Sequence, residues 1–443
     1  MRRLSSAILL HVTRLPLLWA RAAFLLLLVL VSNLWSQAAF GQVLYGTLLG
    51  TITDSTGAAV PSATITATAT ATGVQATGST DARGLYRLQQ LQPGNYRIMV
   101  EAAGFAKTAK SGVDVPNNTP TREDIALGIE SSNQTVEVTA DSATLQTDSG
   151  DLHTQLTSRE VQNIPTSGYR NYQSLLNLVP GATPSRFQNS ALDTPARSLT
   201  TNINGTERGS NLTSVDGAAI QMPYLPHNTI YNPPTEAIES VNIVTNSFTA
   251  EQGIAGGAVV TVITRSGTNR FHGVAFEDNT NSAFDAKNYF YLRANKPKNI
   301  LNQFGGAIGG PIRHDKLFFF SNYEGMIQRQ DFSGIFTVPT LAQRNGDFTG
   351  LATIYDPSTG NPDGTGRTAF QNNIVPMARQ SSAAQKTLSL VPLPNLPGLS
   401  SNYFASATLG LSRHSFDEKV TWQISPKQQF FGKYSLMKAH IVA

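Results

Sequence analysis

Histidine is the residue in this sequence with the widest chemical range, because it can bind a metal or transfer a proton near neutral pH. The seven histidines stand at positions 11, 153, 227, 272, 314, 414 and 440. No two of them have the spacing of a metal-binding pair on one helix, and the chain has no cysteine that could supply a thiolate ligand or a nucleophile. The pattern therefore predicts no transition-metal centre.

The spacing also argues against a calcium site and a phosphate loop. Between Asp356 and Gly366, oxygen-bearing side chains at positions 356, 361 and 363 lie among glycines, but they depart from the EF-hand spacing and predict an ordinary polar loop. The pairs Gly305-Gly306 and Gly309-Gly310 favour close backbone approach within a strand. The chain also lacks a GxSxG elbow and a GxxxxGK(S/T) loop. We therefore expect no catalytic residue, no cofactor and no bound metal, and hence no enzyme.

Length and charge bound the class of protein. At 443 residues, the chain has room for two or three domains with sizeable cores. Basic residues number 33 and acidic residues 29, but four arginines precede residue 42 in a region without acidic residues. The remaining chain carries 29 of each, so it is neutral and its charge gives no reason to expect a nucleic-acid partner. The lack of cysteine excludes a disulfide framework but not an oxidising compartment.

The first 41 residues have the pattern of a secretory signal peptide. A head with Arg2 and Arg3 precedes an apolar run from Ala22 to Val31, and small residues follow up to Gly41-Gln42, where cleavage is expected. The alternative is an uncleaved anchor helix. The run of ten apolar residues is shorter than the ~20 that span a bilayer, which favours the cleaved signal.

Residues 44–130 have the pattern of a small β-sandwich. Short stretches rich in β-branched residues alternate with Gly and Pro turns at regular spacing. The motifs GTITDSTGAAVPSATIT, TDARGLYRL and LQPGNYRIMVEAAGF resemble the carboxypeptidase-regulatory-like domain. Despite that name, no peptidase is implied, because residues 44–130 contain no histidine that could bind a catalytic metal.

The stretch from Asn202 to Gly273 predicts a compact sheet domain with tight turns. Asp216-Gly217 is a hairpin-turn dipeptide flanked by apolar residues, so two strands should meet there. The run Val259–Thr264 is too rich in Val and Ile to favour a helix. Upstream, residues 158–165 and 172–181 have helix-compatible spacing, with Ser158 as the expected N-cap of the first helix and a Pro near the end of each.

The same region resembles the plug domain of TonB-dependent outer-membrane receptors, and within that family the Oar-like branch, which places a carboxypeptidase-regulatory-like domain before the plug. The resemblance is carried by EAIESV at 236–241, AEQG at 250–253, Gly256-Gly257 and the strand Val259–Gly267, which occur in the family's order. The two upstream helices are similar to the plug's early helices. The resemblance implies a plug domain over residues 141–267.

After residue 267 the pattern is that of long strands with one polar and one apolar face. In 415–424, for example, Phe416 and Trp422 lie on the face suited to lipid, and Asp417, Lys419 and Thr421 lie on the face suited to water or a plug. The expected strands are 270–278, 302–312, 317–328, 415–424 and 428–437. Short turns at 313–316 and 425–427 contrast with a long insertion at 329–414, as in outer-membrane barrels, so residues 268–443 predict the start of a β-barrel. Period-two alternation alone leaves a soluble sandwich with an apolar interior as an alternative.

Residues 131–140 form a linker in which one segment is similar to a TonB box. That candidate consists of Thr135, Val136, Glu137, Val138 and Thr139. In the family, this box pairs as a strand with a periplasmic TonB-type energy-transducing protein, and an extended β-branched segment has the free backbone groups for such pairing. The alternatives are a terminal strand of the sandwich and the first strand of the plug.

The sequence thus predicts a mainly β protein: a β-sandwich, an α+β plug and the first strands of an incomplete transmembrane β-barrel. The resemblance implies a non-catalytic TonB-dependent receptor or transporter of the outer membrane, with a TonB-type protein, outer-membrane lipid and an unidentified external ligand as partners. The alternative is a secreted cell-surface binding protein. We expect the 443 residues to be incomplete, since five barrel strands are fewer than the ~8 of the smallest barrels and the ~22 of plugged transporters.

The exported protein is expected to lack residues up to about Gly41, because the short apolar run behind a basic head is a substrate for signal peptidase. Intact-mass measurement of the protein from the outer membrane checks this. A mature chain that retains residues 1–31 would show that the segment is an anchor.

Overall fold

The computed structural model describes residues 45–443, apart from 118, 130–135, 140–149, 151, 167–168, 188–197, 249–251, 254, 292–295, 426–427 and 443. The signal peptide expected at residues 1–41 and Thr135 of the TonB-box candidate lie outside the described residues. Among the helices that are described, none is long and apolar enough to cross a membrane.

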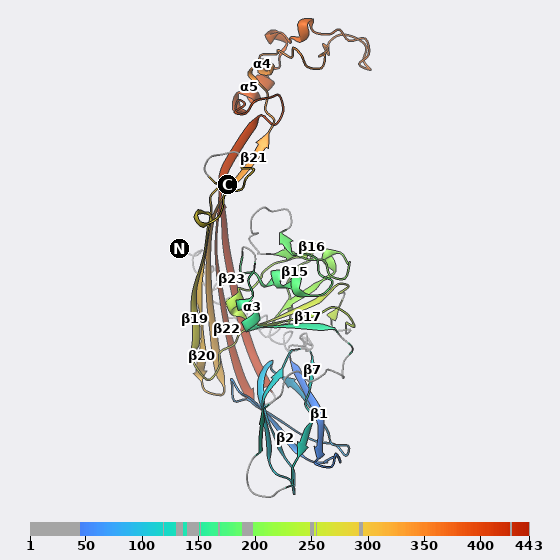
Figure 1. The fold of residues 1–443 in the computed structure, drawn as a ribbon, viewed down its shortest axis with the longest axis vertical. Coiled ribbons are helices and arrows are strands. Elements are labelled where there is room, and N and C mark those ends of the chain that lie inside the picture. The colour runs from blue at the N-terminus through green and yellow to red at the C-terminus, as the bar shows by residue number, and fades with distance from the viewer. Residues whose placement is uncertain are drawn as a thin grey trace, which may run out of the picture.

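The N-terminal unit is a sandwich of two sheets (Figure 1). One sheet has the order β4–β1–β7, with β8 also paired to β1, and the other has the order β3–β2–β5–β6–β9. The strands are β1 Gly46–Asp54, β2 Thr64–Ala69, β3 Gln75–Ser79, β4 Leu85–Leu91, β5 Gly94–Glu101, β6 Thr108–Val115, β7 Pro120–Arg122, β8 Ile125–Leu127 and β9 Val136–Thr139.

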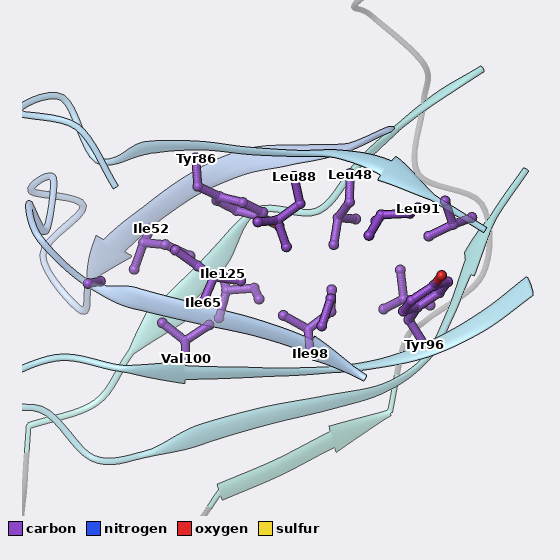
Figure 2. Packing of buried hydrophobic residues seen from close by; sticks show 14 of the residues in the cluster. Leu48, Ile52, Ile65, Tyr86, Leu88, Leu91, Tyr96, Ile98, Val100 and Ile125 are labelled. Atoms are coloured by element: carbon purple, nitrogen blue, oxygen red, sulfur yellow. The ribbon is translucent and has the colours of Figure 1, made fainter. Parts of the chain in front are cut away.

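Strict alternation along the strands builds the sandwich core. On β5, Tyr96, Ile98 and Val100 are buried, whereas Arg97 and Glu101 are exposed. Figure 2 shows these three side chains meeting others from β1, β2, β4 and β8. Because one face of each strand is apolar, burying those faces against each other drives the two sheets together.

The central unit is built on a five-stranded sheet of order β10–β17–β18–β13–β14. Its strands are β10 His153–Thr157, β13 Leu212–Val215, β14 Ala218–Ala219, β17 Ile238–Val244 and β18 Val259–Thr264. The β-branched strand β18 is central and buried throughout, as its composition predicts. The Asp216-Gly217 hairpin is confirmed, with φ values of 47° and 84° that match a tight turn between β13 and β14.

Short elements surround this sheet. They are α3 Ser158–Asn163, the 3₁₀ helices η1 Tyr172–Leu178, η2 Arg208–Ser210 and η3 Thr235–Ala237, and the small strands β11 Arg186–Phe187, β12 Leu199–Thr200, β15 Gln221–Met222 and β16 Leu225–Thr229. Both predicted helices exist, but the N-cap of α3 is Thr157 and not Ser158. The reason is a capping box, in which Thr157 and Glu160 each bond the other's backbone N–H.

The C-terminal unit is an antiparallel sheet of order β19–β20–β21–β22–β23. Its strands are β19 His272–Asn281, β20 Asn299–Arg313, β21 Leu317–Phe336, β22 Tyr403–Ser425 and β23 Gln428–Val442. The five predicted strands are thus confirmed, and all run longer than expected. In the part of the chain that the structure describes, they form an open sheet along one side of the central unit (Figure 1).

The predicted boundaries of the long insertion, 329–414, are wrong. β21 and β22 remain paired from Leu317↔Trp422 to Phe336↔Tyr403, so the connection spans only 337–402. Residues 331–336 and 403–408 lie beyond the last pairings with β20 and β23 and pair only with each other. This two-stranded ribbon lacks the clear apolar alternation of the five-stranded sheet, which is called the wall below. The connection itself contains α4 Leu341–Arg344, α5 Ser382–Leu390, η6 Gln371–Asn373 and η7 Met377–Arg379, and η5 Ser282–Phe284 follows β19.

The predicted division of the wall strands into two faces is confirmed. On β22, Phe416 and Trp422 are nearly half exposed on the outer face, whereas Asp417, Lys419 and Thr421 are buried against the central unit. Close backbone approach at Gly305 is also confirmed, because a Cβ there would lie 2.1 Å from the Tyr323 carbonyl oxygen.

Replacing Ile98 by alanine is expected to destabilise the sandwich by about 2–5 kcal/mol, because the side chain is fully buried in a core made only of sandwich residues. Urea unfolding of the isolated residues 44–130 measures this, and Gln89→Ala on the exposed face of β4 is the control, with an expected change within about 0.5 kcal/mol. Failure of the isolated segment to unfold cooperatively would show that the sandwich is no independent domain.

Candidate functional site

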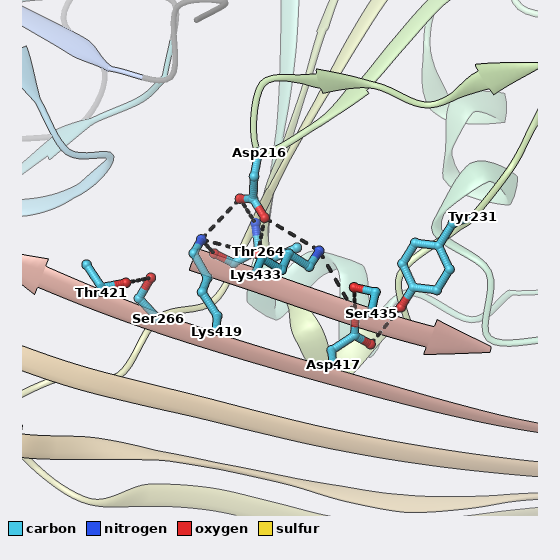
Figure 3. A network of polar contacts seen from close by, with 9 residues as sticks. All are labelled: Asp216, Tyr231, Thr264, Ser266, Asp417, Lys419, Thr421, Lys433 and Ser435. Atoms are coloured by element: carbon cyan, nitrogen blue, oxygen red, sulfur yellow. Dashed lines mark hydrogen bonds and ion pairs between the residues drawn. The ribbon is translucent and has the colours of Figure 1, made fainter. Parts of the chain in front are cut away.

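The turn that carries Asp216 points a carboxylate from the central unit at the inner face of the strand sheet. Lys419 of β22 places its Nζ 3.1 Å from Asp216 Oδ1, and Lys433 of β23 places its Nζ 3.5 Å from Oδ2 (Figure 3). The side chains of Asp216 and Lys419 are only 7% and 9% exposed. A buried ion pair between residues 203 positions apart in sequence therefore joins the central unit to the strand sheet.

Backbone and hydroxyl groups complete the coordination of both charges. Thr264, at the end of β18, donates its backbone N–H to Asp216 Oδ1 over 3.0 Å and its hydroxyl to Oδ2. Lys419 donates to the Thr264 carbonyl oxygen at 3.0 Å and lies 5.2 Å from the centre of the Phe431 ring. Such partners replace the water that both ions lose on burial.

The pKa of Asp216 lies below the ordinary value of a carboxyl group. Burial raises the pKa, but Lys419, Lys433 and the Thr264 hydrogen bonds favour the charged form more strongly. Asp216 is therefore an anion at any pH near neutrality.

Asp417 extends the same network along the inner face of β22. It accepts hydrogen bonds from the Tyr231 hydroxyl at 2.6 Å and from the Ser435 hydroxyl at 2.6 Å, and Lys433 Nζ lies 3.9 Å away. Tyr231 belongs to the central unit, whereas Ser435 is on β23. The polar alternation on β22 thus supplies a second contact between the units (Figure 3).

The ion pair between Asp216 and Lys419 is called the plug clamp below, because it fixes the central unit to the strand sheet. A second clamp lies at the opposite edge of that sheet. Arg170, just before η1, forms ion pairs with Glu236 of η3 and with Asp278 of β19. Its guanidinium carbon lies 4.2 Å from the centre of the Phe276 ring, also on β19. The central unit is therefore attached by charge to β19 at one edge and to β22 and β23 at the other.

The TonB-box candidate is placed as a strand for Val136 to Thr139. This strand, β9, pairs in parallel with β6, from Thr108↔Val136 to Ser111↔Thr139, and is the last strand in its sheet. The alternative of a terminal sandwich strand therefore describes its position in this structure. Its role in partner binding stays a prediction.

The loop considered for calcium uses its carboxylates internally. Asp356 Oδ1 accepts from the Ser358 N–H at 2.9 Å and contacts Arg379 Nη2 at 2.5 Å, and Asp363 Oδ1 accepts from the Thr365 N–H at 3.0 Å. Among the residues that the structure describes, no group of three or more His, Cys, Asp or Glu side chains could hold a metal ion.

Sequence reasoning missed both clamps as sites. Asp216 was noted only for its turn, and Lys419 and Asp417 only for the face on which they lie. The one available signal was a run of charged residues on a strand face that the resemblance assigns to the interior, where charges need partners. Arg170 gave no signal of its own.

Three family models match consecutive parts of the chain. The carboxypeptidase regulatory-like domain matches residues 47–128, the TonB-dependent receptor plug domain 150–260 and an outer membrane beta barrel domain 263–443. A plug domain held against outer-membrane barrel strands is the arrangement of a TonB-dependent receptor. The three matches together support that class for this chain, with a regulatory-like sandwich before its plug.

The comparison with curated proteins gives one relative, the TonB-dependent transporter Oar of Myxococcus xanthus, which is 29% identical over 307 residues. The match covers 66% of this chain and 27% of the relative, so the chain spans about a quarter of that protein's length.

Two solved structures align with 66% of the chain. They are the siderophore receptor PirA of Acinetobacter baumannii, at 18% identity and a TM-score of 0.35 over 32% of that protein, and the ferric enterobactin receptor PfeA of Pseudomonas aeruginosa, at 14% identity and a TM-score of 0.36 over 33% of that protein.

Replacing Asp216 by asparagine is expected to reduce the free energy that holds the plug against the strand sheet by about 3 kcal/mol. The substitution leaves Lys419 charged and without its carboxylate in a buried site. Hydrogen exchange of the β18 backbone amides measures the effect, with roughly 100-fold faster exchange expected. The control is Asp285→Asn, an exposed carboxyl after η5, which should leave exchange unchanged.

The pH dependence gives a second readout of the same pair. Because the pKa of Asp216 is lowered in the folded protein, its contribution is complete above the ordinary carboxyl range and is lost as the pH falls through the lowered value. Exchange protection of β18 should be constant from about pH 8 to 5 and fall below about pH 4. A fall already near pH 6 would contradict this assignment.

Proposed function

We propose that the protein is a TonB-dependent transporter that moves an unidentified ligand across the outer membrane without catalysing a covalent reaction. The observation that carries this proposal is the plug held by ion pairs at both edges of a barrel-type sheet, the pair between Asp216 and Lys419 being buried. A plug fixed by charge can be released without unfolding a shared apolar core. That property suits a gate better than a rigid scaffold.

We also propose the partners. The outer face of the strand sheet, with Phe416, Val420, Trp422 and Ile424 each nearly half exposed, contacts outer-membrane lipid. The segment from Thr135 to Thr139 binds a periplasmic TonB-type protein as an added strand. The loops beyond β21 and β22 meet the external ligand, and no nucleic acid takes part.

The proposed function also implies a division of the chain into domains. We propose a signal peptide at 1–41, the sandwich at 44–130, a linker with the TonB box at 131–140, the plug at 141–267 and barrel strands from 268 to 443. Membrane fractionation of the full reading-frame product tests the class: release from the outer membrane by detergent alone supports a transporter, whereas release by salt would favour a secreted surface-binding protein.

Replacing Val136 by proline is expected to abolish binding of the TonB-type partner, because proline removes the backbone N–H and fixes φ in a segment that must pair as a strand. Pull-down with the soluble C-terminal domain of the host's TonB-type protein measures binding, with a loss of at least about tenfold. Val136→Thr keeps both the N–H and the β-branch and is the matched control. Normal binding by both Val136→Pro and Val138→Pro would place the coupling segment elsewhere.

A further inference from the structure

The sandwich lies against one end of both the plug and the strand sheet (Figure 1). Its loop between β2 and β3 contacts Asn269, in the link from the plug to β19. The Asn269 N–H donates to the Ala71 carbonyl oxygen over 3.0 Å, and its side-chain amide donates to the Thr72 carbonyl oxygen over 2.9 Å. The sandwich is thus bonded to the chain at the point where the plug ends and the wall begins.

The same Asn269 side chain reaches the turn between β20 and β21. Its Nδ2 donates to Asp315 Oδ1 at 2.6 Å, and the Asp315 backbone N–H donates to Asn269 Oδ1 at 2.8 Å. One asparagine therefore joins the sandwich, the plug-to-barrel link and a barrel turn.

A second docking point lies on the plug sheet. Asn242 of β17 donates from its side chain to the Asn117 carbonyl oxygen at 2.8 Å and lies 3.3 Å from Thr119 Oγ1. All three residues are buried. At the end of β6, Asp114 is also hydrogen bonded to Gln155 of β10. The contact with the plug is therefore closed to solvent, yet polar.

Among the residues that the structure describes, no buried apolar cluster spans this interface. The apolar cluster of the sandwich contains only sandwich residues, and that of the plug contains only plug residues, among the residues that the structure describes. Interfaces between domains that rest on polar contacts without a shared core permit relative motion. The sandwich is thus docked in a way that can be reversed.

The docked sandwich also lines the space beside the Asp216–Lys419 ion pair. A cleft of about 150 Å³ is lined by Ala71 and Thr72 from the sandwich, Asp216 and Thr264 from the plug, and Lys419 and Thr421 from β22. The sandwich loop is one wall of this cleft and the ion pair is another. Removing the sandwich would take away one wall of this cleft and expose the ion pair further to bulk water, in which the attraction between two charges is about fourfold weaker than in protein surroundings.

We propose that the sandwich is a detachable cap on the plug clamp. Docked through Asn269 and Asn242, it limits the access of bulk water to the Asp216–Lys419 pair and so keeps the plug in place; released, it leaves the pair more exposed to bulk water and loosens the plug. The proposal deepens the proposed function and rests on it, since it assigns a control of plug release to a domain that has no other role here.

The test uses a single thiol as a reporter in the full reading-frame product. The 443 residues contain no cysteine, so Thr421→Cys, at a buried position that lines the cleft, adds the only thiol among them, and any cysteine elsewhere in the full product is replaced by serine. Its rate of modification by a polar maleimide reports how often the cap opens. All variants below carry this reporter.

Asn269→Asp is expected to raise the modification rate about tenfold, because the new carboxylate faces the Asp315 carboxylate and the Thr72 carbonyl oxygen, neither of which can donate. Adding Asp315→Asn restores a donor and should return the rate toward that of the parent. This rescue separates loss of docking from misfolding. Gln89→Ala, on the exposed face of the sandwich, is the control and should leave the rate unchanged.

The link to the plug is measured with the same variants in planar lipid bilayers, using potassium chloride as the probe. Openings should be about tenfold more frequent with Asn269→Asp and fall again with Asp315→Asn added. Equal modification rates in all variants would overturn the cap, and faster modification without more frequent openings would overturn its control of the plug. Failure of the proposed function is distinguishable, because it appears as a protein that does not bind the TonB-type domain whatever these rates are.

Discussion

The burial of Asp216 and Lys419 between two domains is the constraint that fixes the arrangement of the chain. Removing each ion from water costs several kcal/mol, and the cost is offset only where the opposite charge and the hydrogen bonds of Thr264 are all present. Those groups belong to different domains, so they meet only when the plug is seated in one position. Such a pair adds little net stability, but any other position of the plug would leave a buried charge without its partner and would therefore be strongly unfavourable.

Most of the buried apolar surface lies within the domains and little of it lies between them. The sandwich and the plug each have a large core of their own, whereas the apolar clusters that join plug and wall are small, such as Ala237 with Ala307 and Phe320. A plug that leaves the wall therefore exposes mostly polar surface, which water can solvate. Each domain can stay folded while the contacts between domains break. This separation of folding from docking is what a movable plug requires.

The sequence predicted the elements better than it predicted the contacts. Alternation on β22 placed Phe416 outside and Lys419 inside, and the Asp216-Gly217 dipeptide located a real turn, because both signals are local. The partners of Asp216 were missed because Lys419 lies 203 residues away, and no local pattern reports such a pairing. The ends of β21 and β22 were misplaced for a related reason. Beyond the wall they pair only with each other, so neither face needs to be apolar.

The position of β9 determines where a pull on the coupling segment would act first. β9 is hydrogen bonded to β6 of the sandwich, whereas 13 residues, 140–152, separate it from β10, the first plug strand. A chain of that length can span at most about 45 Å. If a partner binds at 135–139 as we propose, its pull therefore loads the β6–β9 pairing, and through it the sandwich, before any force reaches the plug along the chain. The sandwich would leave its docking site first, and the plug would then be pulled from a clamp already open to water.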